Sequence, residues 1–397
     1  MKEVFFVSAK RTPIGNYLGS LKTVRSQDLA AVTMKAALEE AALDSGALDM
    51  SIYSQSLQSS LPANVGRHAW TLAGLSEAPA GYTLNTLCAG ALQTMISGFN
   101  KLVGDEYSGV LVGGVDSYSM AQYYLFHPRY RIRPGELCFH DPKTEVETNA
   151  QPRERYGELS AAALADGIAR RCGFVRKDLD LHVWSDRQRR LAAMDAGGIS
   201  EEIVPAPVKY KGKEGSVAAD DPPGCATLEE LTGLPSVRAS GCATKASLAP
   251  WADGAASLVM LSGDRAAELG CMPLAKMAGF GVAAGNPLFL EKTTVRSINR
   301  ALAMCNLRLE EVDFFEIHSP SAAYALAVEN ELGGAVSGRI NVDGSSLSLG
   351  HPGAATGGVM AVRLIRRLKA QRGRRGLINV GALGGQSLSI VIEGICK

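Results

Sequence analysis

One cysteine stands at the kind of position that a nucleophile needs. Cys88 lies in a turn of small residues, 85–90, directly before the apolar run 91–102, whose spacing predicts a helix. A thiol at the first turn of a helix lies against the positive end of the helix dipole, where the thiolate is favoured and free backbone N–H groups can bind an anion. A single cysteine among eight is, however, more often a small buried hydrophobic residue, so the rest of the chain has to decide.

The composition indicates a soluble, cytoplasmic α/β protein with more than one packed unit. The chain has 397 residues, 46% of them hydrophobic and 6% aromatic, and its 43 glycines are typical of packed α/β layers joined by glycine turns. A formal net charge of +1 argues against nucleic acid or a membrane surface as the main partner. The cysteines form no CxxC pair, which predicts neither a metal site nor a disulfide framework. The first apolar run, 4–9, is too short for a signal peptide.

Hydrophobic patterns predict an α/β unit around Cys88, followed by an inserted lobe. Strands are expected at 4–9, 82–87 and 109–114, and helices at 28–42, within 66–81 and at 91–102. The order strand, turn, helix, strand is that of a parallel α/β unit. From about 119 to 250 the composition changes, with helices expected at 159–171 and 181–196 and a charged, irregular stretch at 209–223.

The second half of the chain repeats this pattern. After a buried strand at 253–261 come a helix at 295–305, a strand at 314–318, a glycine-rich turn at 348–358, a helix at 359–371, and strands at 376–380 and 387–393. Each half therefore has a glycine-rich turn, a helix and a strand that closes on a Gly-Gly pair, Gly113-Gly114 or Gly384-Gly385. Two similar halves packed face to face would place both turns near a common centre.

Several blocks of the sequence resemble those of the thiolase superfamily, in the same order and over nearly the whole chain. They are the segments 8–15, 85–90, 113–120, 201–205, 253–256 and 350–352, and the closing Gly384-Gly385-Gln386. The resemblance implies an α/β fold of five layers, αβαβα, in which two similar halves enclose central helices. It also implies an N-terminal half at 1–118, completed by about 251–270, a C-terminal half at 271–397, and an inserted loop lobe at 119–250 that covers the side that binds CoA.

The resemblance also implies roles for three residues. Cys88 matches the nucleophile that becomes acylated, and His351 matches the histidine that activates this thiol, although a histidine that caps a helix start would look the same in isolation. His318 matches a position where thiolases carry asparagine or histidine, and it would orient a water or bind the acyl oxygen in an oxyanion hole. The glutamate and phenylalanine that follow this position in thiolases are replaced here by Ser319 and Ser321.

The largest departure concerns a second cysteine, which in thiolases removes or returns the proton at the α-carbon. Alignment on the closing glycines places Gly381 at that position. Glycine transfers no proton, and the neighbours Ala382 and Leu383 cannot replace a cysteine.

Candidate substrate-binding residues lie in the lobe and beside the missing cysteine: Ser247, Ala249, Leu383, Gly384, Arg129, Arg131 and Arg133. Ala249 falls where thiolases carry a serine near the pantetheine. The three arginines could meet the CoA phosphates, because arginine forks suit phosphate oxygens, although basic loop residues are more often merely solvated.

These residues predict an acyltransferase that loads an acyl group from acyl-CoA or a carrier onto Cys88 and then forms or cleaves a carbon–carbon bond with altered proton-transfer chemistry. Three alternatives stay open. They are a decarboxylative condensation by Cys88, His318 and His351, which resembles the triad of ketosynthases; a catalytically weakened partner subunit in a hetero-complex; and an ordinary thiolase whose missing cysteine is Cys138 or Cys242. We expect a homodimer or tetramer that uses a CoA thioester as substrate and holds no permanent cofactor.

Overall fold

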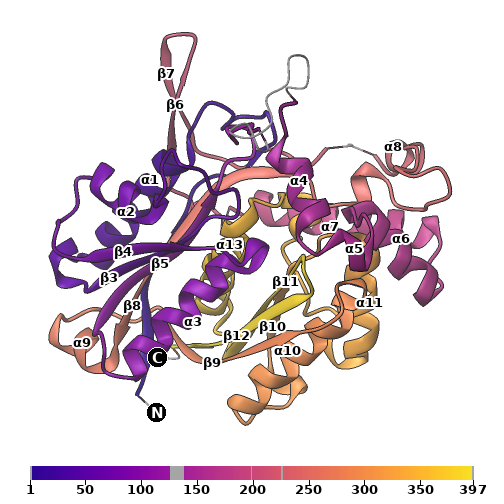
Figure 1. Cartoon of the computed structure of the whole chain (residues 1–397). Coiled ribbons are helices and arrows are strands. Elements are labelled where there is room, and N and C mark those ends of the chain that lie inside the picture. Colours follow the sequence, from indigo (N-terminus) through magenta and orange to yellow (C-terminus); the bar gives the residue numbers. More distant parts are fainter. Residues whose placement is uncertain (1, 126–137, 198, 225–226, 396–397) are drawn as a thin grey trace.

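A mixed sheet runs through the whole molecule (Figure 1). The computed structural model describes residues 2–125, 138–197, 199–224 and 227–395. Ten strands of this part of the chain form the sheet, in the order β10 (Phe314–Ile317), β11 (Arg375–Ala382), β12 (Gln386–Gly394), β9 (Ala275–Ala284), β1 (Val4–Arg11), β8 (Ala252–Ser262), β5 (Gly109–Asp116), β3 (Met50–Ser54) and β4 (Ala80–Leu84), with β2 (Gly15–Asn16) pairing with β8.

The sheet consists of two halves that meet at a short junction. β1 and β9 pair over two residues, where Phe5 and Phe6 lie opposite Lys276 and Ala275. β1 pairs with β8, and β9 with β12, over almost their full length. The strands farthest from the junction are parallel to their neighbours, as seen for β3 with β4 and for β10 with β11. Because few backbone hydrogen bonds join the two halves of the sheet, helices can pack on both faces of each half.

Helices complete an order of five layers, αβαβα, as predicted from the sequence. α1 (Ser26–Ala41) and α2 (Val65–Leu72) pack on the outside of the N-terminal half of the sheet, and α10 (Leu290–Met304) and α11 (Ala322–Leu332) on the outside of the C-terminal half. α3 (Gly90–Val103) and α13 (Thr356–Gln371) lie between the halves and contact both of them (Figure 1). None of the helices in the described ranges is both long enough and apolar enough to cross a membrane.

The two central helices meet near their N-terminal ends because one of them carries a glycine at the contact. A Cβ atom on Gly357, in the first turn of α13, would lie 2.7 Å from Cγ of Leu92 in α3. Each helix follows a short 3₁₀ turn, η2 (Leu87–Ala89) before α3 and η7 (Gly353–Ala355) before α13. The two turns are in contact, so the two glycine-rich segments of the chain share one centre.

The inserted lobe lies over one end of the layers (Figure 1). Its elements are α4 (Pro142–Asn149), α5 (Arg153–Tyr156), α6 (Ala161–Cys172), α7 (Arg176–Asp195), β6 (Ala206–Tyr210), β7 (Lys213–Val217) and α8 (Leu228–Thr232). Buried charges join it to the core: Arg11 of β1 lies 2.6 Å from Glu202 and 2.7 Å from Asp220, and Arg190 of α7 also pairs with Asp220. Buried charges are tolerated only when paired, so this network ties the lobe to one position.

Several elements differ from the prediction. The helix expected at 91–102 spans 90–103, whereas the helix expected at 181–196 begins at 176. β3, β9 and α11 were not predicted; β9 is rich in alanine and glycine, and its sequence has no clear alternation of apolar and polar residues. The stretch 209–223, predicted to be irregular, contains most of a hairpin formed by β6 and β7. Lys211 and Gly212 at its tip have φ values of +49° and +78°, as tight hairpin turns require.

We predict that Gly114→Ala destabilises the protein where the sheet contacts η7. Gly114 lies in β5, and a Cβ atom there would lie 2.6 Å from the backbone oxygen of Ala354. Because a backbone atom has little room to move, this overpacking should lower the free energy of unfolding by about 1–3 kcal/mol, measured by urea denaturation. Gly334→Ala is the control, since a Cβ atom there meets nothing within 4 Å. Equal stability of the two variants would contradict the prediction.

Candidate active site

Cys88 lies on a tight turn at the start of a central helix. It belongs to η2, and α3 begins two residues later. Leu87, directly before it, has a φ of +53°, a strained conformation that clusters at active sites. Asn85 holds the turn: its Oδ1 accepts a hydrogen bond from the backbone nitrogen of Leu87 at 2.9 Å, and its Nδ2 donates to the carbonyl oxygen of Ser56 at 3.1 Å. The turn thus presents the thiol to the space ahead of the helix.

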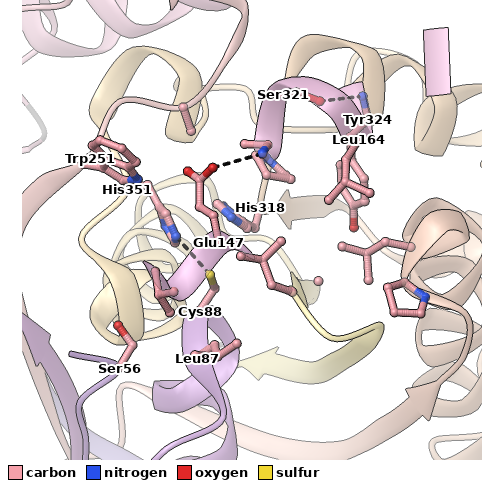
Figure 2. Close-up of a pocket in the computed structure, with 18 of the residues that line it drawn as sticks. Ser56, Leu87, Cys88, Glu147, Leu164, Trp251, His318, Ser321, Tyr324 and His351 are labelled. Carbon is pink, nitrogen blue, oxygen red and sulfur yellow. Dashed lines mark hydrogen bonds between the residues drawn. The ribbon is translucent and has the colours of Figure 1, made fainter. Parts of the chain in front are cut away.

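His351 is held beside Cys88 by both its backbone and its ring (Figure 2). Its Nε2 lies 3.0 Å from Sγ of Cys88, and its Nδ1 lies 2.7 Å from Oγ1 of Thr356 in α13. Its backbone nitrogen donates to the carbonyl oxygen of Pro250 at 2.8 Å, and its carbonyl oxygen accepts from the nitrogen of Ala252 in β8 at 3.2 Å. The ring is therefore positioned to accept the proton of the thiol.

Burial keeps this pair neutral at rest. It raises the pKa of the Cys88 thiol to about 12, with the charge of Asp116 acting in the same direction. Burial also lowers the pKa of His351 to about 4. The sequence-based expectation of a favoured thiolate at the helix start is therefore wrong for the resting site, since loss of water outweighs the helix dipole. The nucleophile must form by proton transfer to His351 during attack.

Backbone N–H groups face the sulfur of Cys88. Those of Cys88 itself and of Leu383 form hydrogen bonds that act against the rise in the thiol pKa. Donors that point at the sulfur lie close to the oxygen of any acyl group that the sulfur carries. They are therefore candidate oxyanion-hole donors, which lower the barrier by stabilising charge that develops on that oxygen.

His318 is the third member of the cluster. Its ring stacks on that of His351, with centroids 4.5 Å apart and an angle of 30° between the ring planes. Nδ1 of His318 lies 2.7 Å from Oγ of Ser346, and its backbone nitrogen donates to the carbonyl oxygen of Asn379 at 2.9 Å. Burial, and then the neighbouring His351, lower the pKa of His318 well below its usual range. A neutral imidazole in this position can donate a hydrogen bond to an acyl oxygen.

The same three side chains could hold a metal ion. One ligand atom from each of Cys88, His318 and His351 lies within 4.8 Å of the others. The second nitrogen of each ring, however, is bonded to a hydroxyl group, of Ser346 or Thr356, rather than to the carboxylate or carbonyl that usually orients a metal-binding histidine. The arrangement therefore suits proton transfer and hydrogen bonding better than metal binding.

The cluster opens into a pocket of about 100 Å³ with largely apolar walls. The apolar lining residues are Leu87, Val146, Ala161, Leu164, Ile168, Ala249, Trp251, Pro287, Leu290, Pro320, Gly381 and Leu383. The polar ones outside the cluster are Ser56, Tyr118, Glu147, Ser321 and Tyr324. Such walls suit the acyl part of a thioester better than a charged group.

The structure brings together part of the predicted substrate-binding set. Ala249 and Leu383 line the pocket. Ser247 and Gly384 do not belong to its lining; the hydroxyl of Ser247 is used in a local turn, where it donates to the carbonyl oxygen of Thr244 at 3.1 Å. Arg129, Arg131 and Arg133 lie outside the described residues.

A tyrosine fills the space that a side chain at position 381 would occupy. Gly381 lines the pocket, and a Cβ atom there would lie 2.5 Å from Oη of Tyr324, 3.1 Å from Oγ1 of Thr294 and 3.3 Å from Cδ2 of Leu290. Tyr324 is 1% exposed and shares a hydrogen bond with Thr294. Glycine at 381 is therefore a packing requirement of this tyrosine.

The cysteines proposed as replacements lie elsewhere. Neither Cys138 nor Cys242 belongs to the lining of the pocket. Cys138 is exposed, and the sulfur of Cys242 lies 3.8 Å from Oδ1 of Asp166 in the lobe. Among the described residues, Cys88 supplies the one sulfur atom of the pocket lining.

Most of the other lining residues were not predicted from the sequence, among them Trp251, Tyr118, Tyr324 and Glu147. Trp251, one of three tryptophans, lies two residues after Ala249, and its ring stacks on that of Tyr118 at 6.0 Å, so a large aromatic residue in the expected substrate segment was an available signal. Tyr324 follows the altered stretch after His318. Glu147 gave no local signal, because the lobe has no regular pattern that would predict which residues face the core.

Two sequence models of protein domains match the chain. The model "Thiolase, N-terminal domain" matches residues 4–264, and "Thiolase, C-terminal domain" matches residues 271–394. The mitochondrial 3-ketoacyl-CoA thiolase of Homo sapiens is 30% identical over 396 residues, which cover 99% of this chain and 98% of the relative. The beta-ketoadipyl-CoA thiolase of Pseudomonas aeruginosa is 32% identical over 399 residues, with 99% of both covered. The chain belongs to the thiolase family, whose members are acyltransferases, and the resemblance found in the sequence is confirmed.

Solved thiolase structures have the same fold. The acetyl-CoA acetyltransferase of Bacillus anthracis gives a TM-score of 0.94 at 30% identity, covering 100% of this chain and 99% of that one. Human mitochondrial 3-ketoacyl-CoA thiolase gives 0.92 at 29% identity, with 99% of both chains covered. The same human enzyme in complex with CoA gives 0.91 at 28% identity, covering 99% of this chain and 98% of that one. The predicted fold class is confirmed over the length of the chain.

We predict that acid destabilises the protein partly through His351. Its pKa is about 4 in the folded protein against an ordinary 6.5, so the unfolded chain binds more protons between these values. Neutral His351 therefore costs the folded protein no stability above about pH 6.5, and the free energy of unfolding falls as the pH is lowered toward 4. Urea denaturation at pH 7 and 4 should show that His351→Asn loses about 3 kcal/mol less than the wild type over this range. The exposed His68→Asn should behave like the wild type; identical pH dependence of all three proteins would refute the prediction.

We predict that Gly381→Cys alone destabilises the protein and that Tyr324→Phe relieves the effect. The new side chain would collide with Oη of Tyr324, and such overpacking costs about 1–3 kcal/mol. Removal of that oxygen opens the space, while Thr294 keeps a hydroxyl partner in Ser387 at 3.2 Å. The measurement is the thermal midpoint of the two single variants and the double variant. A Gly381→Cys protein as stable as the wild type would show that the tyrosine does not occupy this space.

Proposed function

We propose that the protein is an acyl-CoA acyltransferase that carries the acyl group on Cys88 and then forms or cleaves a carbon–carbon bond. The observation that carries the proposal is the distance of 3.0 Å between Nε2 of His351 and Sγ of Cys88 in an apolar pocket. The names of relatives, such as 3-ketoacyl-CoA thiolase and acetyl-CoA acetyltransferase, describe chemistry on CoA thioesters. The human thiolase structure in complex with CoA supports the same substrate class.

The first step follows from the geometry of the pair. Sγ of Cys88 attacks the carbonyl carbon of an acyl-CoA, and Nε2 of His351 takes the thiol proton. The N–H groups of Cys88 and Leu383 would stabilise the oxyanion, and the ring of His318, which stacks on His351 and has a nitrogen within 4.8 Å of Sγ of Cys88, is a further donor. Collapse of the tetrahedral intermediate breaks the bond to the CoA sulfur, which receives the proton from His351. The products are acyl-Cys88 and free CoA.

The second step needs a carbanion at the α-carbon of another thioester. In thiolases a second cysteine forms this carbanion by removing a proton from the α-carbon. Here Gly381 stands at the position of that cysteine. One candidate is proton removal by a different side chain. The other is decarboxylative condensation, in which loss of carbon dioxide supplies the carbanion. Two neutral, stacked imidazoles next to Cys88 would serve either route, because both can hydrogen-bond the enolate oxygen that forms in each. Comparing acetyl-CoA and malonyl-CoA as donors, with carbon dioxide release as readout, separates the two.

We predict that Cys88→Ala abolishes acyl-enzyme formation and leaves the fold intact. The substitution removes one sulfur at a helix start and with it the nucleophile. Intact-protein mass spectrometry after incubation with acetyl-CoA should show the acyl mass on the wild type and none on the variant, with unchanged circular dichroism. Cys305→Ala, which changes a partly buried cysteine outside the pocket, is the matched control.

Two results would count against the proposal. An adduct of undiminished yield on Cys88→Ala would place the acyl group on another residue. A wild-type protein that gains no acyl mass from any thioester would instead favour the partner-subunit interpretation.

A further inference from the structure

Glu147 lines the pocket of Cys88, and the acylation step makes no use of it (Figure 2). Among the described residues, it is the one carboxylate of the pocket lining. It belongs to α4 in the lobe, whereas Cys88, His318 and His351 come from the layered core. The pocket is therefore completed by a titratable group that the lobe brings to it from outside the cluster.

The carboxylate of Glu147 is fixed in position by one of its two oxygens. Oε2 accepts a hydrogen bond from the backbone nitrogen of Ala161, the first residue of α6, at 3.1 Å. Helix starts have free N–H groups and a positive dipole end, and both favour a carboxylate. This hydrogen bond holds the Glu147 side chain at the wall of the pocket, to which Ala161 also belongs. Oε1 of Glu147 takes no part in joining α4 to α6.

No cation neutralises Glu147 within the described part of the chain. Its carboxylate takes part in none of the ion pairs found there. Lys143, one turn earlier in α4, acts on Glu147 only through its charge, because its Nζ lies 3.5 Å from Asp141 and 4.2 Å from the centre of the Trp251 ring. A carboxylate committed to a purely structural role would more often be paired with such a cation.

The electrostatic surroundings make Glu147 a better base than an exposed glutamate. Burial raises its pKa above the ordinary 4.5, against the opposing effects of the Ala161 N–H group and of Lys143. Its charge reaches the reacting centre, since it contributes to the raised pKa of both Cys88 and Tyr118. A carboxylate with a raised pKa is better matched to proton transfer near neutral pH.

We infer that Glu147 takes the place of the missing cysteine and removes the proton from the α-carbon of the second acyl-CoA. The inference rests on the proposed function, because the step needs an acyl group on Cys88. The bond between hydrogen and the α-carbon breaks, the proton goes to the Glu147 carboxylate, and the electron pair attacks the carbonyl carbon of acyl-Cys88. Collapse then breaks the thioester bond, and the Cys88 thiolate receives the proton that Glu147 holds. The reverse sequence describes thiolytic cleavage.

Hydrogen–deuterium exchange tests the proton transfer separately from acylation. Acetyl-CoA is incubated with the protein in D₂O, and deuterium at its methyl group is followed by mass spectrometry, alongside the yield of acyl-Cys88. Glu147→Gln keeps an oxygen that can accept from Ala161 but removes the base. It should lower exchange by about 10²- to 10⁴-fold and leave the yield of acyl-Cys88 unchanged. Glu145→Gln, on the same helix and bonded to His140 at 2.9 Å, should alter neither readout.

Chemical rescue separates a catalytic role from a structural one. Glu147→Ala removes the carboxylate, and formate added in solution should restore part of the exchange, which it would not do if the side chain only joined α4 to α6. Equal exchange by the wild type and Glu147→Gln would overturn the inference, and so would a wild type that forms acyl-Cys88 but catalyses no exchange. A wild type that forms no acyl-Cys88 at all would mark failure of the proposed function instead.

Discussion

The structure depends on the close approach of two helix starts between the halves of one sheet. α3 and α13 meet where Gly357 has no side chain to collide with Leu92, and the turns before them bring Cys88 and His351 to 3.0 Å although 263 positions separate them in the chain. A bulkier residue at the contact would move the helices apart. Because hydrogen bonds weaken steeply with distance, a small shift of either helix would break the hydrogen bond between the Cys88 thiol and the His351 ring.

The same enclosure decides the protonation of the site. His318 and His351 are buried and Cys88 is partly buried, and burial disfavours the charged form of each, so the cluster rests as a neutral thiol beside neutral rings. A resting ion pair would have to carry the cost of burying two charges. A neutral pair avoids this cost, and charge then develops only when a thioester carbonyl is present to receive it and N–H groups are aligned to stabilise it.

The residues around Gly381 fit the absence of a side chain at this position. Tyr324 reaches the space beside Gly381, and its hydroxyl is satisfied by Thr294, so the wall of the pocket is complete without a cysteine. The lobe contributes the Glu147 carboxylate to the same pocket, on a helix that is not part of the layers. The pocket thus holds a titratable group besides Cys88, His318 and His351. The fold itself is unaffected, as the TM-scores of 0.91 to 0.94 with other thiolases show.

The sequence by itself determined most of the individual helices and strands, because these depend on local patterns, and its resemblance to thiolases implied the five layers and the cluster of Cys88, His318 and His351. Apolar periodicity predicts the central helices, and the small-residue turns around Cys88 and His351 need residues without bulky side chains, so they can be recognised without knowing their neighbours. The absence of a cysteine at 381 was equally readable. Only the tertiary structure decided that Tyr324 fills this space, that Glu147 lines the pocket of Cys88 and that the thiol is protonated at rest. Side-chain packing and burial depend on contacts between segments that are far apart in the chain, so no local sequence pattern predicts them.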